Sequence, residues 1–264
     1  MIRANDDGDG ACVVLLHAFP CDRRLWQPQA QVLVDAGFRV VVPDLPGFGS
    51  SGLPDAEPSL AAVAQLIVDY LDSLGIQRCI LGGVSLGGYV AMAMLRVRPE
   101  LAGAALLCGT KATADSDEAA ANRERLASMV DARPLDCARI LDQALFPGLL
   151  GPTTRASRPE VVEVVQGWLS DARPDAVAWY QRAMAQRPDS RDVLAELEAP
   201  ALVVWGAEDG LISYPEQELM LEALRDGTLH TVAGAGHLTG IELPAEVNDV
   251  VLRFAESVRG QRPS

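Results

Sequence analysis

The stretch Gly82-Gly83-Val84-Ser85-Leu86-Gly87-Gly88 decides the fold of this chain. It lies between the apolar runs Cys79–Leu81 and Tyr89–Leu95, a pattern that predicts a buried strand, a tight turn and a helix. A glycine stands two positions before and two positions after Ser85, where a Cβ would collide with the turn. The turn therefore pushes the Ser85 hydroxyl out of the sheet and aims the first free N–H groups of the helix at whatever this hydroxyl attacks.

Gly-x-Ser-x-Gly fixes only three residues, so the motif by itself is a weak signal in a chain with 23 glycines. A serine hydroxyl is a poor nucleophile at neutral pH and needs a base, and the base needs an acid that orients it. Of the three histidines, His17 ends the first expected strand, His230 falls within another strand, and His237 follows a Gly-x-Gly turn in a loop. Asp209 lies in the loop after an earlier strand, so the order along the chain is serine, aspartate, histidine.

This combination resembles the α/β-hydrolase superfamily. The resemblance implies that Ser85 is the nucleophile, that Asp209 is the acid at the family's Gly-x-x-Asp position, and that His237 is the base at its Gly-x-Gly-His position. Glu208 stands beside Asp209 and carries the same charge, so it is the alternative acid. The serine argues against the related haloalkane dehalogenases and epoxide hydrolases, which use an aspartate in its place.

The segment His17-Ala18-Phe19-Pro20 resembles the His-Gly-x-Pro oxyanion loop of this superfamily. The resemblance implies that the backbone N–H groups of Phe19 and Leu86 hold the oxyanion of the reaction. Ala18 replaces the family's glycine, so the turn must be one that a Cβ tolerates. His17 is interpreted as a structural histidine that hydrogen-bonds to neighbouring loops.

The pattern of the whole chain predicts an α/β protein with the α/β-hydrolase fold: a mostly parallel sheet flanked by helices, with an all-helical cap insertion. Strands are expected at residues 12–17, 38–43, 79–81, 104–108, 200–205 and 228–232, and helices at 26–36, 60–74 and 244–258. Members of the superfamily usually carry an antiparallel hairpin before the first of these strands. We expect this chain to be truncated there and its sheet to be shorter.

Residues 110–199 contain no convincing strand and several helical segments separated by prolines. We therefore expect a core of residues 1–109 and 200–264 and a cap of residues 110–199, which lies above the carboxyl ends of the strands and roofs the substrate pocket. The residues expected to line this pocket are His17, Phe19, Leu145, Phe146, Trp168, Trp179 and Leu238. One arginine of the cap is a candidate for binding a substrate carboxylate, but no single position is indicated.

The composition limits the partners of the protein. A net charge of −14 over 264 residues disfavours nucleic acids and anionic membranes, because both would repel the protein. No apolar run approaches the roughly 20 residues that span a bilayer and no signal peptide begins the chain, so we expect a cytoplasmic protein. Its five cysteines lack Cys-x-x-Cys spacing and are expected to be reduced. No metal and no organic cofactor are expected, and the protein is expected to be a monomer or a homodimer.

Gly47, Gly49 and Gly52 raise a different function, because they spell Gly-x-Gly-x-x-Gly. A dinucleotide site needs a helix that opens within these glycines, so that its N-terminus meets the pyrophosphate. Two prolines follow instead, and no strand ends in an acidic residue at the required distance. The segment from Asp44 to Ser51 resembles a glycine-rich loop of the α/β-hydrolases.

The resemblance extends to bacterial cofactor-free carboxylesterases and to the group of 3-oxoadipate enol-lactonases, on the segments Ser85–Ala91 and Gly109–Asp115. It implies hydrolysis of a small ester or lactone through an acyl-enzyme. A C–C bond hydrolase or a cofactor-free perhydrolase would share the triad and differ in the cap. A non-catalytic binding protein on the same fold is the third alternative, which the intact triad disfavours.

Overall fold

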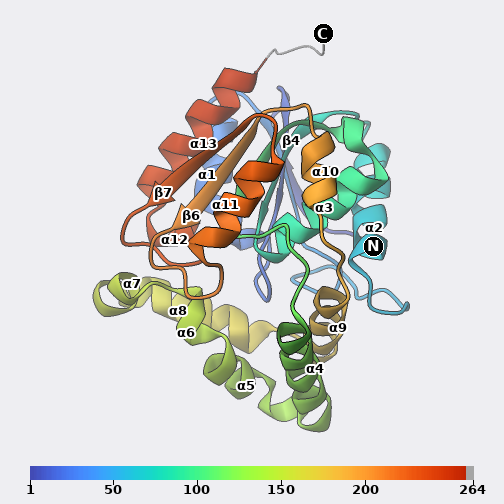
Figure 1. Cartoon of the computed structure of the whole chain (residues 1–264), viewed down its shortest axis with the longest axis vertical. Helices are drawn as coiled ribbons and strands as arrows, with labels where there is room; N and C mark the ends of the chain where they lie inside the picture. The colour runs from blue at the N-terminus through green and yellow to red at the C-terminus, as the bar shows by residue number, and fades with distance from the viewer. Residues whose placement is uncertain (260–264) are drawn as a thin grey trace.

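The structure is a computed structural model that describes residues 1–259. Its centre is a seven-stranded sheet with the strand order β1-β3-β2-β4-β5-β6-β7 (Figure 1). β1 and β3 are antiparallel, and all other neighbouring strands are parallel. The strands are β1 (Ala4–Asp7), β2 (Cys12–Leu16), β3 (Arg39–Pro43), β4 (Cys79–Val84), β5 (Ala102–Cys108), β6 (Ala201–Gly206) and β7 (Gly227–Val232). The expected mostly parallel sheet is thus confirmed, and residues 260–264 of the expected core lie outside the described part.

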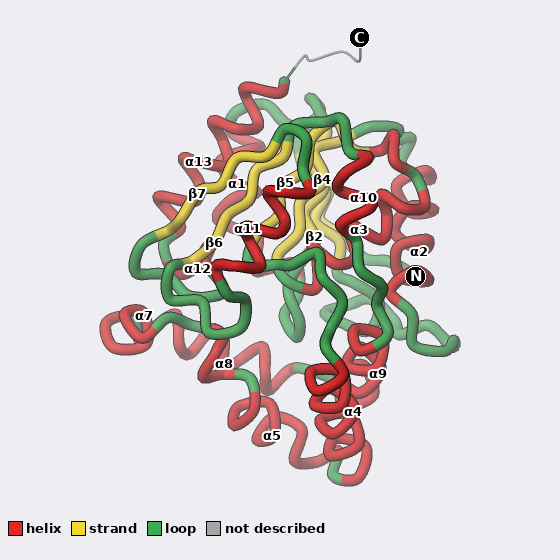
Figure 2. The backbone as a smooth tube through the Cα atoms, viewed as in Figure 1, coloured by secondary structure: helices red, strands yellow, loops and turns green. Residues whose placement is uncertain are grey.

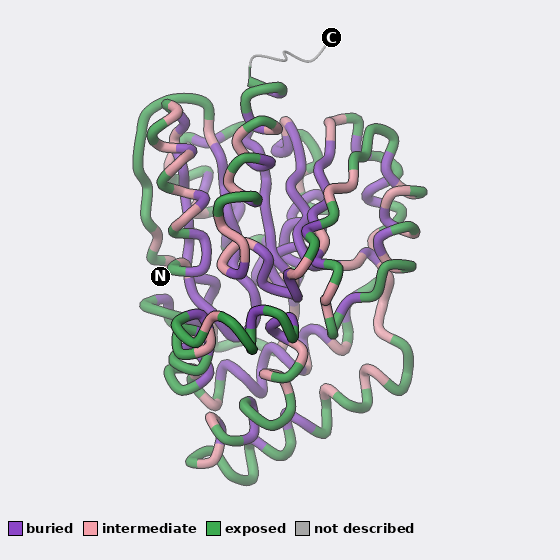
Figure 3. Tube along the Cα trace, turned by 90° about the vertical axis from the view of Figure 1, so that its left-hand side faces the viewer, coloured by how far each residue is buried: buried purple, intermediate pink, exposed green. Residues whose placement is uncertain are grey.

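The central strands are buried on both faces. Val13–Leu16 of β2 are at most 1% exposed, and every residue of β4 is buried. Figure 3 shows the same strands as a buried block inside the sheet layer. A strand that is covered on both sides has no face exposed to solvent, so its apolar residues do not alternate with polar ones. This explains why these strands are continuous apolar runs in the sequence.

Helices cover both faces because the strand order reverses. β2 leads to β3 on one side and β4 leads to β5 on the other, so right-handed crossovers place α1 on one face and α2, α3 and α11 on the opposite face. α13 packs against α1, while α10 packs against α3 and α11. The bounds are α1 (Gln27–Asp35), α2 (Leu60–Ser73), α3 (Leu86–Val97), α10 (Arg191–Glu196), α11 (Tyr214–Ala223), α12 (Thr239–Glu242) and α13 (Pro244–Val258).

The helix α2 begins and packs as its sequence predicts. The Ser59 side chain accepts a hydrogen bond from the N–H of Ala62 at 3.3 Å and so caps the first turn. The buried residues recur at helical spacing and face α3 and the sheet: Leu60, Val63, Ala64, Ile67, Val68 and Leu71. This stripe is part of the core.

The start of the sheet differs from the expectation. The first strand is β1, not the strand at Cys12, and it pairs with β3 from Ala4 opposite Pro43 to Asp7 opposite Val40. Arg39 donates two hydrogen bonds to the Asp6 carboxylate across this pair. β1 is exposed and polar, so backbone pairing holds this edge of the sheet, with little apolar burial.

The cap consists of helices that lie beyond the carboxyl ends of the strands, below the sheet in Figure 1 and entirely helix and loop in Figure 2. These helices are α4 (Asp117–Ala132), α5 (Cys137–Ala144), α6 (Phe146–Leu149), α7 (Pro152–Ser157), α8 (Pro159–Asp171) and α9 (Pro174–Ala185). α4 packs on α9, and α8 packs on α5 and α7. Within residues 1–259, no helix combines the length and the hydropathy that crossing a membrane requires.

Candidate active site

Ser85 stands at the turn between β4 and α3 in a strained conformation. Its φ of 53° and ψ of −113° make it the one residue other than glycine with a positive φ in the described chain. A Cβ on Gly83 would lie 2.2 Å from the carbonyl carbon of Gly87, and a Cβ on Gly87 would lie 2.1 Å from the oxygen of Leu16. The two glycines are therefore required by the close approach of the chain to itself, and they hold Ser85 at the apex.

The strand order explains where this turn lies. The strands β2 and β4 are neighbours, and the chain leaves them in opposite directions. Loops therefore diverge at their carboxyl ends and leave a crevice, which is where open α/β sheets bind ligands. Ser85 follows β4 here, and the loop His17–Pro20 follows β2.

Asp209 and His237 form a buried pair at the same edge of the sheet. Oδ2 of Asp209 lies 2.9 Å from Nδ1 of His237, and their side chains are 0% and 1% exposed. Oδ1 of Asp209 accepts hydrogen bonds from the N–H groups of Leu211 at 2.8 Å and Ile212 at 3.0 Å. The carboxylate is thus fixed by the backbone, and it fixes the imidazole so that Nε2 is left for another partner.

Nε2 of His237 is buried and has no hydrogen-bond partner among the described residues. Ser85 Oγ makes no hydrogen bond to it within the described residues 1–259. Catalytic hydrogen bonds are commonly long in a free enzyme and shorten when substrate binds. An unpartnered ring nitrogen opposite a fixed carboxylate is the arrangement that a general base needs.

Glu208, the neighbour of Asp209, points to the cap instead. Its carboxylate accepts hydrogen bonds from the N–H of Thr153 at 2.9 Å and from the hydroxyl of Thr153 at 2.5 Å. The hydroxyl bond and then the backbone bond lower the pKa of Glu208. Among the described residues, the hydrogen bond to the His237 ring comes from Asp209 and not from Glu208.

The two expected oxyanion donors are free. Neither the N–H of Phe19 nor that of Leu86 donates a hydrogen bond to another described residue. Ala18 is buried and does not adopt a positive φ, so the turn tolerates its Cβ. Free N–H groups after β2 and at the start of α3 are suited to hold a negative oxygen.

Both ring nitrogens of His17 are hydrogen-bonded to the backbone. Its Nε2 accepts the N–H of Leu45 at 2.9 Å, so Nδ1 carries the proton and donates to the oxygen of Ala18 at 2.9 Å. Burial lowers the pKa of His17 and keeps the ring neutral. Its edge packs on Phe48 with ring centroids 5.6 Å apart, so His17 joins the loop after β2 to the loop after β3.

The expected pocket residues lie in several places. Trp168 of α8 faces the core loops, whereas the indole N–H of Trp179 donates to the oxygen of Ala56 at 2.8 Å. Leu145 and Phe146 are partly buried where α5 meets α6. The helix α6 lies against the loop that contains Asp209, since a Cβ on Gly148 would lie 2.6 Å from the Leu211 side chain. The side chain of Leu238, directly after the histidine, is buried.

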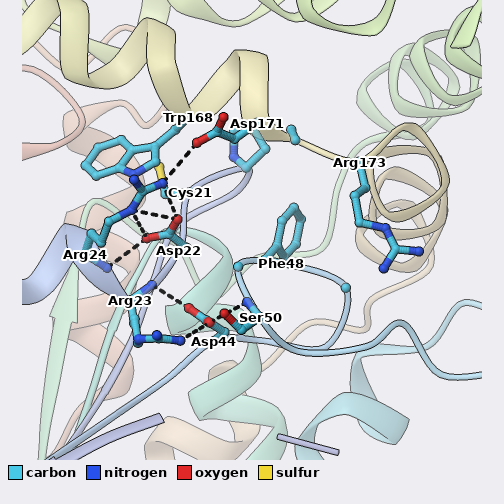
Figure 4. Close-up of a pocket in the computed structure, with 14 residues that line it drawn as sticks. Cys21, Asp22, Arg23, Arg24, Asp44, Phe48, Ser50, Trp168, Asp171 and Arg173 are labelled. Atoms are coloured by element: carbon cyan, nitrogen blue, oxygen red, sulfur yellow. Dashed lines mark hydrogen bonds and ion pairs between the residues drawn. The ribbon is translucent and has the colours of Figure 1, made fainter. Parts of the chain in front are cut away.

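A cleft of about 370 Å³ opens between the cap and the core loops, and Figure 4 shows the side chains around it. Trp168 and Phe48 form apolar walls, and the Phe48 ring lies 5.8 Å from that of Phe19. Arg24 bridges the cleft, because it binds Asp22 of the core at 2.6 Å and Asp171 of the cap at 3.2 Å. The cleft therefore lies beside the loop His17–Pro20, and Ser85 and His237 are not part of its walls.

The glycine-rich loop after β3 is organised by Asp44, not by a helix. The Asp44 carboxylate accepts the N–H groups of Arg23 and Ser50, and it pairs with the Arg23 guanidinium. The next helix, α2, begins only at Leu60, so the loop lacks the helix N-terminus that a dinucleotide site needs. Within the described residues, no group of three or more His, Cys, Asp or Glu side chains is placed to hold a metal ion.

Three residues near the site have no counterpart in the sequence expectations. Phe48 contacts both His17 and Phe19, and Tyr180 of α9 packs on Phe48 with ring centroids 4.9 Å apart. The third is Glu242, whose buried carboxylate binds the backbone around His237. The glycine-rich loop was a signal for the position of Phe48, but nothing in the local sequence distinguishes Tyr180 or Glu242 from ordinary helix residues.

Comparisons with known proteins agree with this fold. A model described as the alpha/beta hydrolase family matches residues 13–250. A thermophilic esterase from Thermogutta terrifontis is 34% identical, with a TM-score of 0.93, and the match covers 98% of this chain and 94% of that one. The enol-lactonase from Burkholderia xenovorans LB400, at 22% identity and a TM-score of 0.86 over 96% and 95% of the two chains, shares the fold. The 2-hydroxy-6-oxo-6-phenylhexa-2,4-dienoate hydrolase of Comamonas testosteroni is 27% identical over 264 residues, which cover 96% of this chain and 91% of the relative.

Proposed function

The chain belongs to the alpha/beta hydrolase family, and we propose that it is a serine hydrolase that cleaves small carboxylic esters or lactones through an acyl-enzyme. The observation that carries this proposal is the buried contact of 2.9 Å between Asp209 and His237, at the same sheet edge as the strained Ser85. Packing of the fold does not require an acid, a base and a nucleophile from three separate loops to lie at the same edge of the sheet. Together they are the parts of an acyl-transfer site.

The first half of the cycle forms the acyl-enzyme. Ser85 Oγ attacks the carbonyl carbon while Nε2 of His237 takes the hydroxyl proton, and Asp209 stabilises the imidazolium. The N–H groups of Phe19 and Leu86 hold the oxyanion, a contact whose loss typically costs about 10²–10³ in rate. The tetrahedral intermediate then expels the alkoxide, which receives the proton from His237.

The second half releases the acid. Water attacks the acyl carbon, and His237 takes its proton and returns it to Ser85 Oγ as the ester bond breaks. The atoms balance with ester and water as the only reactants. A lactone follows the same course, except that no separate alcohol leaves: ring opening gives a hydroxyacyl-enzyme, and water releases a single hydroxy acid.

The similarity to the Thermogutta terrifontis esterase supports an ester as the substrate class, because that protein matches nearly the full length at 34% identity. The cap supports a small substrate, because its helices lie over the carboxyl ends of the strands (Figure 1). Within the expected cap segment 110–199, we propose that α4 to α9 act as this cap, while α10 packs on α3 and α11 and so belongs with the core.

The relative from Comamonas testosteroni supports a second candidate, a C–C bond hydrolase, since its name gives a 6-oxo dienoate as substrate. Such an enzyme uses the same serine and histidine and differs in the groups that bind the substrate. A panel of short esters, lactones and 6-oxo dienoates, each measured as kcat/KM, separates the two candidates. A perhydrolase would in addition require peroxide for its best turnover.

The direct test is hydrolysis of p-nitrophenyl acetate by the wild-type protein and by Ser85→Ala. We expect Ser85→Ala to lose at least about 10³-fold in kcat while it keeps its thermal transition. A fluorophosphonate should label Ser85 in the wild-type protein, as mass spectrometry of the peptides will show. A folded wild-type protein without turnover of any panel substrate, or a label on a different residue, would refute the proposed function and favour a binding protein.

A further inference from the structure

Glu242 is a carboxylate buried without a cation. It ends the short helix α12, is 0% exposed, and forms no ion pair within residues 1–259. Its oxygens instead accept three backbone N–H groups, from Gly151 at 2.8 Å, Gly236 at 2.9 Å and Leu238 at 3.0 Å. Burying a charged group costs free energy unless it is well hydrogen-bonded, so this position is held for a reason beyond packing.

Two of the three donors flank the candidate base. Oε2 accepts the N–H of Gly236 and Oε1 accepts the N–H of Leu238, so one carboxylate binds the backbone on both sides of His237. The loop around His237 lies outside any strand or helix and has no sheet ladder to hold it. The carboxylate therefore replaces that ladder and fixes the backbone from which the imidazole projects.

The third donor comes from the cap. Gly151 directly precedes α7, and its N–H binds the same Oε2 atom as Gly236 does. The two backbones touch, because a Cβ on Gly236 would lie 2.2 Å from the nitrogen of Gly151. Arg158 of the cap adds a hydrogen bond of 2.5 Å to the Glu242 carbonyl oxygen. Glu242 is thus the point where the histidine loop and the cap are joined.

We propose that Glu242 is a positioning residue for the hydrolysis: its carboxylate holds His237 in line with Ser85 and couples this alignment to the seating of the cap segment at Gly151. The proposal rests on the proposed function, since it assigns His237 as the base. Glu242 acts through the backbone and does not touch the reacting atoms.

Glu242→Gln removes one acceptor while it keeps the size of the side chain. The amide oxygen of glutamine can accept the N–H groups of Gly151 and Gly236, but its NH₂ group then faces the N–H of Leu238, and two donors repel each other. Glu242→Asp keeps both acceptors on a shorter arm. We expect Glu242→Gln to lower kcat about 10–100-fold with KM within about threefold, and Glu242→Asp to recover part of the loss.

Glu208→Gln is the matched control, because Glu208 also accepts backbone and hydroxyl donors of the cap at Thr153 and does not bind the backbone beside His237. We expect this variant to lose less than about tenfold in kcat.

The charged groups that face the histidine loop are Asp209, Glu208, Glu242 and, from the cap, Arg158. Loss of the buried Glu242 charge destabilises the imidazolium, so the acidic midpoint of the kcat/KM profile should move to lower pH in Glu242→Gln. The midpoint should move much less in Glu208→Gln, because solvent screens the charge of the more exposed Glu208 carboxylate.

Hydrogen exchange on the wild-type protein tests the same contacts without a variant. We expect the amides of Gly151, Gly236 and Leu238 to exchange at least about 100-fold more slowly than those of the exposed loop around Gly52. Rapid exchange at Gly236 and Leu238, or a folded Glu242→Gln with wild-type kcat and pH profile, overturns the proposal even if ester hydrolysis is present. Absence of hydrolysis in the wild-type protein itself is a separate result, and it overturns the proposed function.

Discussion

The carboxylates of Glu208 and Asp209 are neighbours in the chain but serve different segments. Asp209 binds Nδ1 of His237 at 2.9 Å, whereas Glu208 binds the N–H and the hydroxyl of Thr153 in the cap. The backbone of the loop produces this division, because Oδ1 of Asp209 is itself held by two N–H groups. The family resemblance implied Asp209 as the acid and left Glu208 as the alternative, and of the two carboxylates Asp209 is the one that is hydrogen-bonded to His237.

Asp209→Asn should therefore lower kcat by a factor of about 10³–10⁴, because an amide at this place can present a donor to Nδ1 and favours the wrong tautomer of His237. Glu208→Gln should cost less than about tenfold, since it changes a contact to the cap only. Initial rates with p-nitrophenyl acetate at saturating substrate measure both. The reverse ranking would transfer the role of the acid to Glu208.

Gly87→Ala should disrupt the turn at Ser85. The new Cβ would lie 2.1 Å from the oxygen of Leu16, a backbone atom that cannot move aside, so we expect a loss of at least about 2 kcal/mol of unfolding free energy and of most of the activity. Chemical denaturation followed by circular dichroism measures the first effect, and fluorophosphonate labelling measures the second.

Gly167→Ala is the control for this substitution, because Gly167 also lies within a helix, α8, but a Cβ there would meet nothing within 4 Å. We expect it to stabilise the protein by about 0.5–1 kcal/mol, since alanine loses less backbone entropy in a helix than glycine. Equal losses in both variants would mean that a Cβ on any helical glycine destabilises this protein, and the close approach at Leu16 would then not explain the loss in Gly87→Ala.

Asp115 gives the protein an acid-sensitive contribution to stability. Its side chain is 2% exposed and pairs with Arg187 at 2.9 Å, with Lys111 at 3.5 Å and with Arg123. Burial raises the pKa of Asp115, but the hydrogen bond from Arg187 and the charge of Arg123 outweigh it and lower the pKa from 3.8 to about 2. A shift of this size corresponds to about 2 kcal/mol of folding free energy.

The folded state binds the proton of Asp115 more weakly than the unfolded state does. The contribution is therefore complete above the unfolded pKa of 3.8 and is lost as the pH falls through about 2. At pH 7 we expect Asp115→Asn to lower the unfolding free energy by about 2–4 kcal/mol, because it removes the carboxylate that pairs with Arg187 and Arg123. Thermal unfolding at a series of pH values from 7 to 3 measures this loss. The difference in unfolding free energy between the wild-type protein and Asp115→Asn should become smaller below about pH 4.

Asp131→Asn serves as the control, because Asp131 pairs with Arg182 at 2.7 Å but is half exposed. This pair should contribute less than about 1 kcal/mol. The ion pairs of Asp115 would have no stabilising role if Asp115→Asn lost as little unfolding free energy as Asp131→Asn. The same conclusion would follow if the loss in Asp115→Asn did not change with pH.

Short dissolved esters should be hydrolysed faster than emulsified long-chain triglycerides. The cap helices lie over the carboxyl ends of the strands, the edge at which Ser85 and His237 lie, and a covered site suits a small ligand. The net charge of −14 also disfavours adsorption to anionic interfaces. Parallel assays with p-nitrophenyl acetate and with a triglyceride emulsion decide this, and faster turnover of the emulsion would contradict the assignment to small substrates.

The sequence by itself determined the elements whose signals are local. The apolar run before Ser85 became β4, and the last helix spans Pro244–Val258 as predicted. Gly83 and Gly87 are required, because a Cβ on either would lie less than 2.5 Å from backbone atoms. Such elements follow from the side-chain period, from a capping serine or from the absence of a Cβ, and each is readable within a few residues.

Only the tertiary structure decided the features that join distant segments. β1 has the sequence Ala-Asn-Asp-Asp, which carries no strand signal, and it exists because the edge of β3 offers backbone partners. Glu242 binds Gly151, 91 residues away, and its role beside His237 is invisible until the cap and the histidine loop meet. Backbone hydrogen bonds use groups that every residue has, so which of them pair across the fold depends on packing of the whole chain and not on the local residue types.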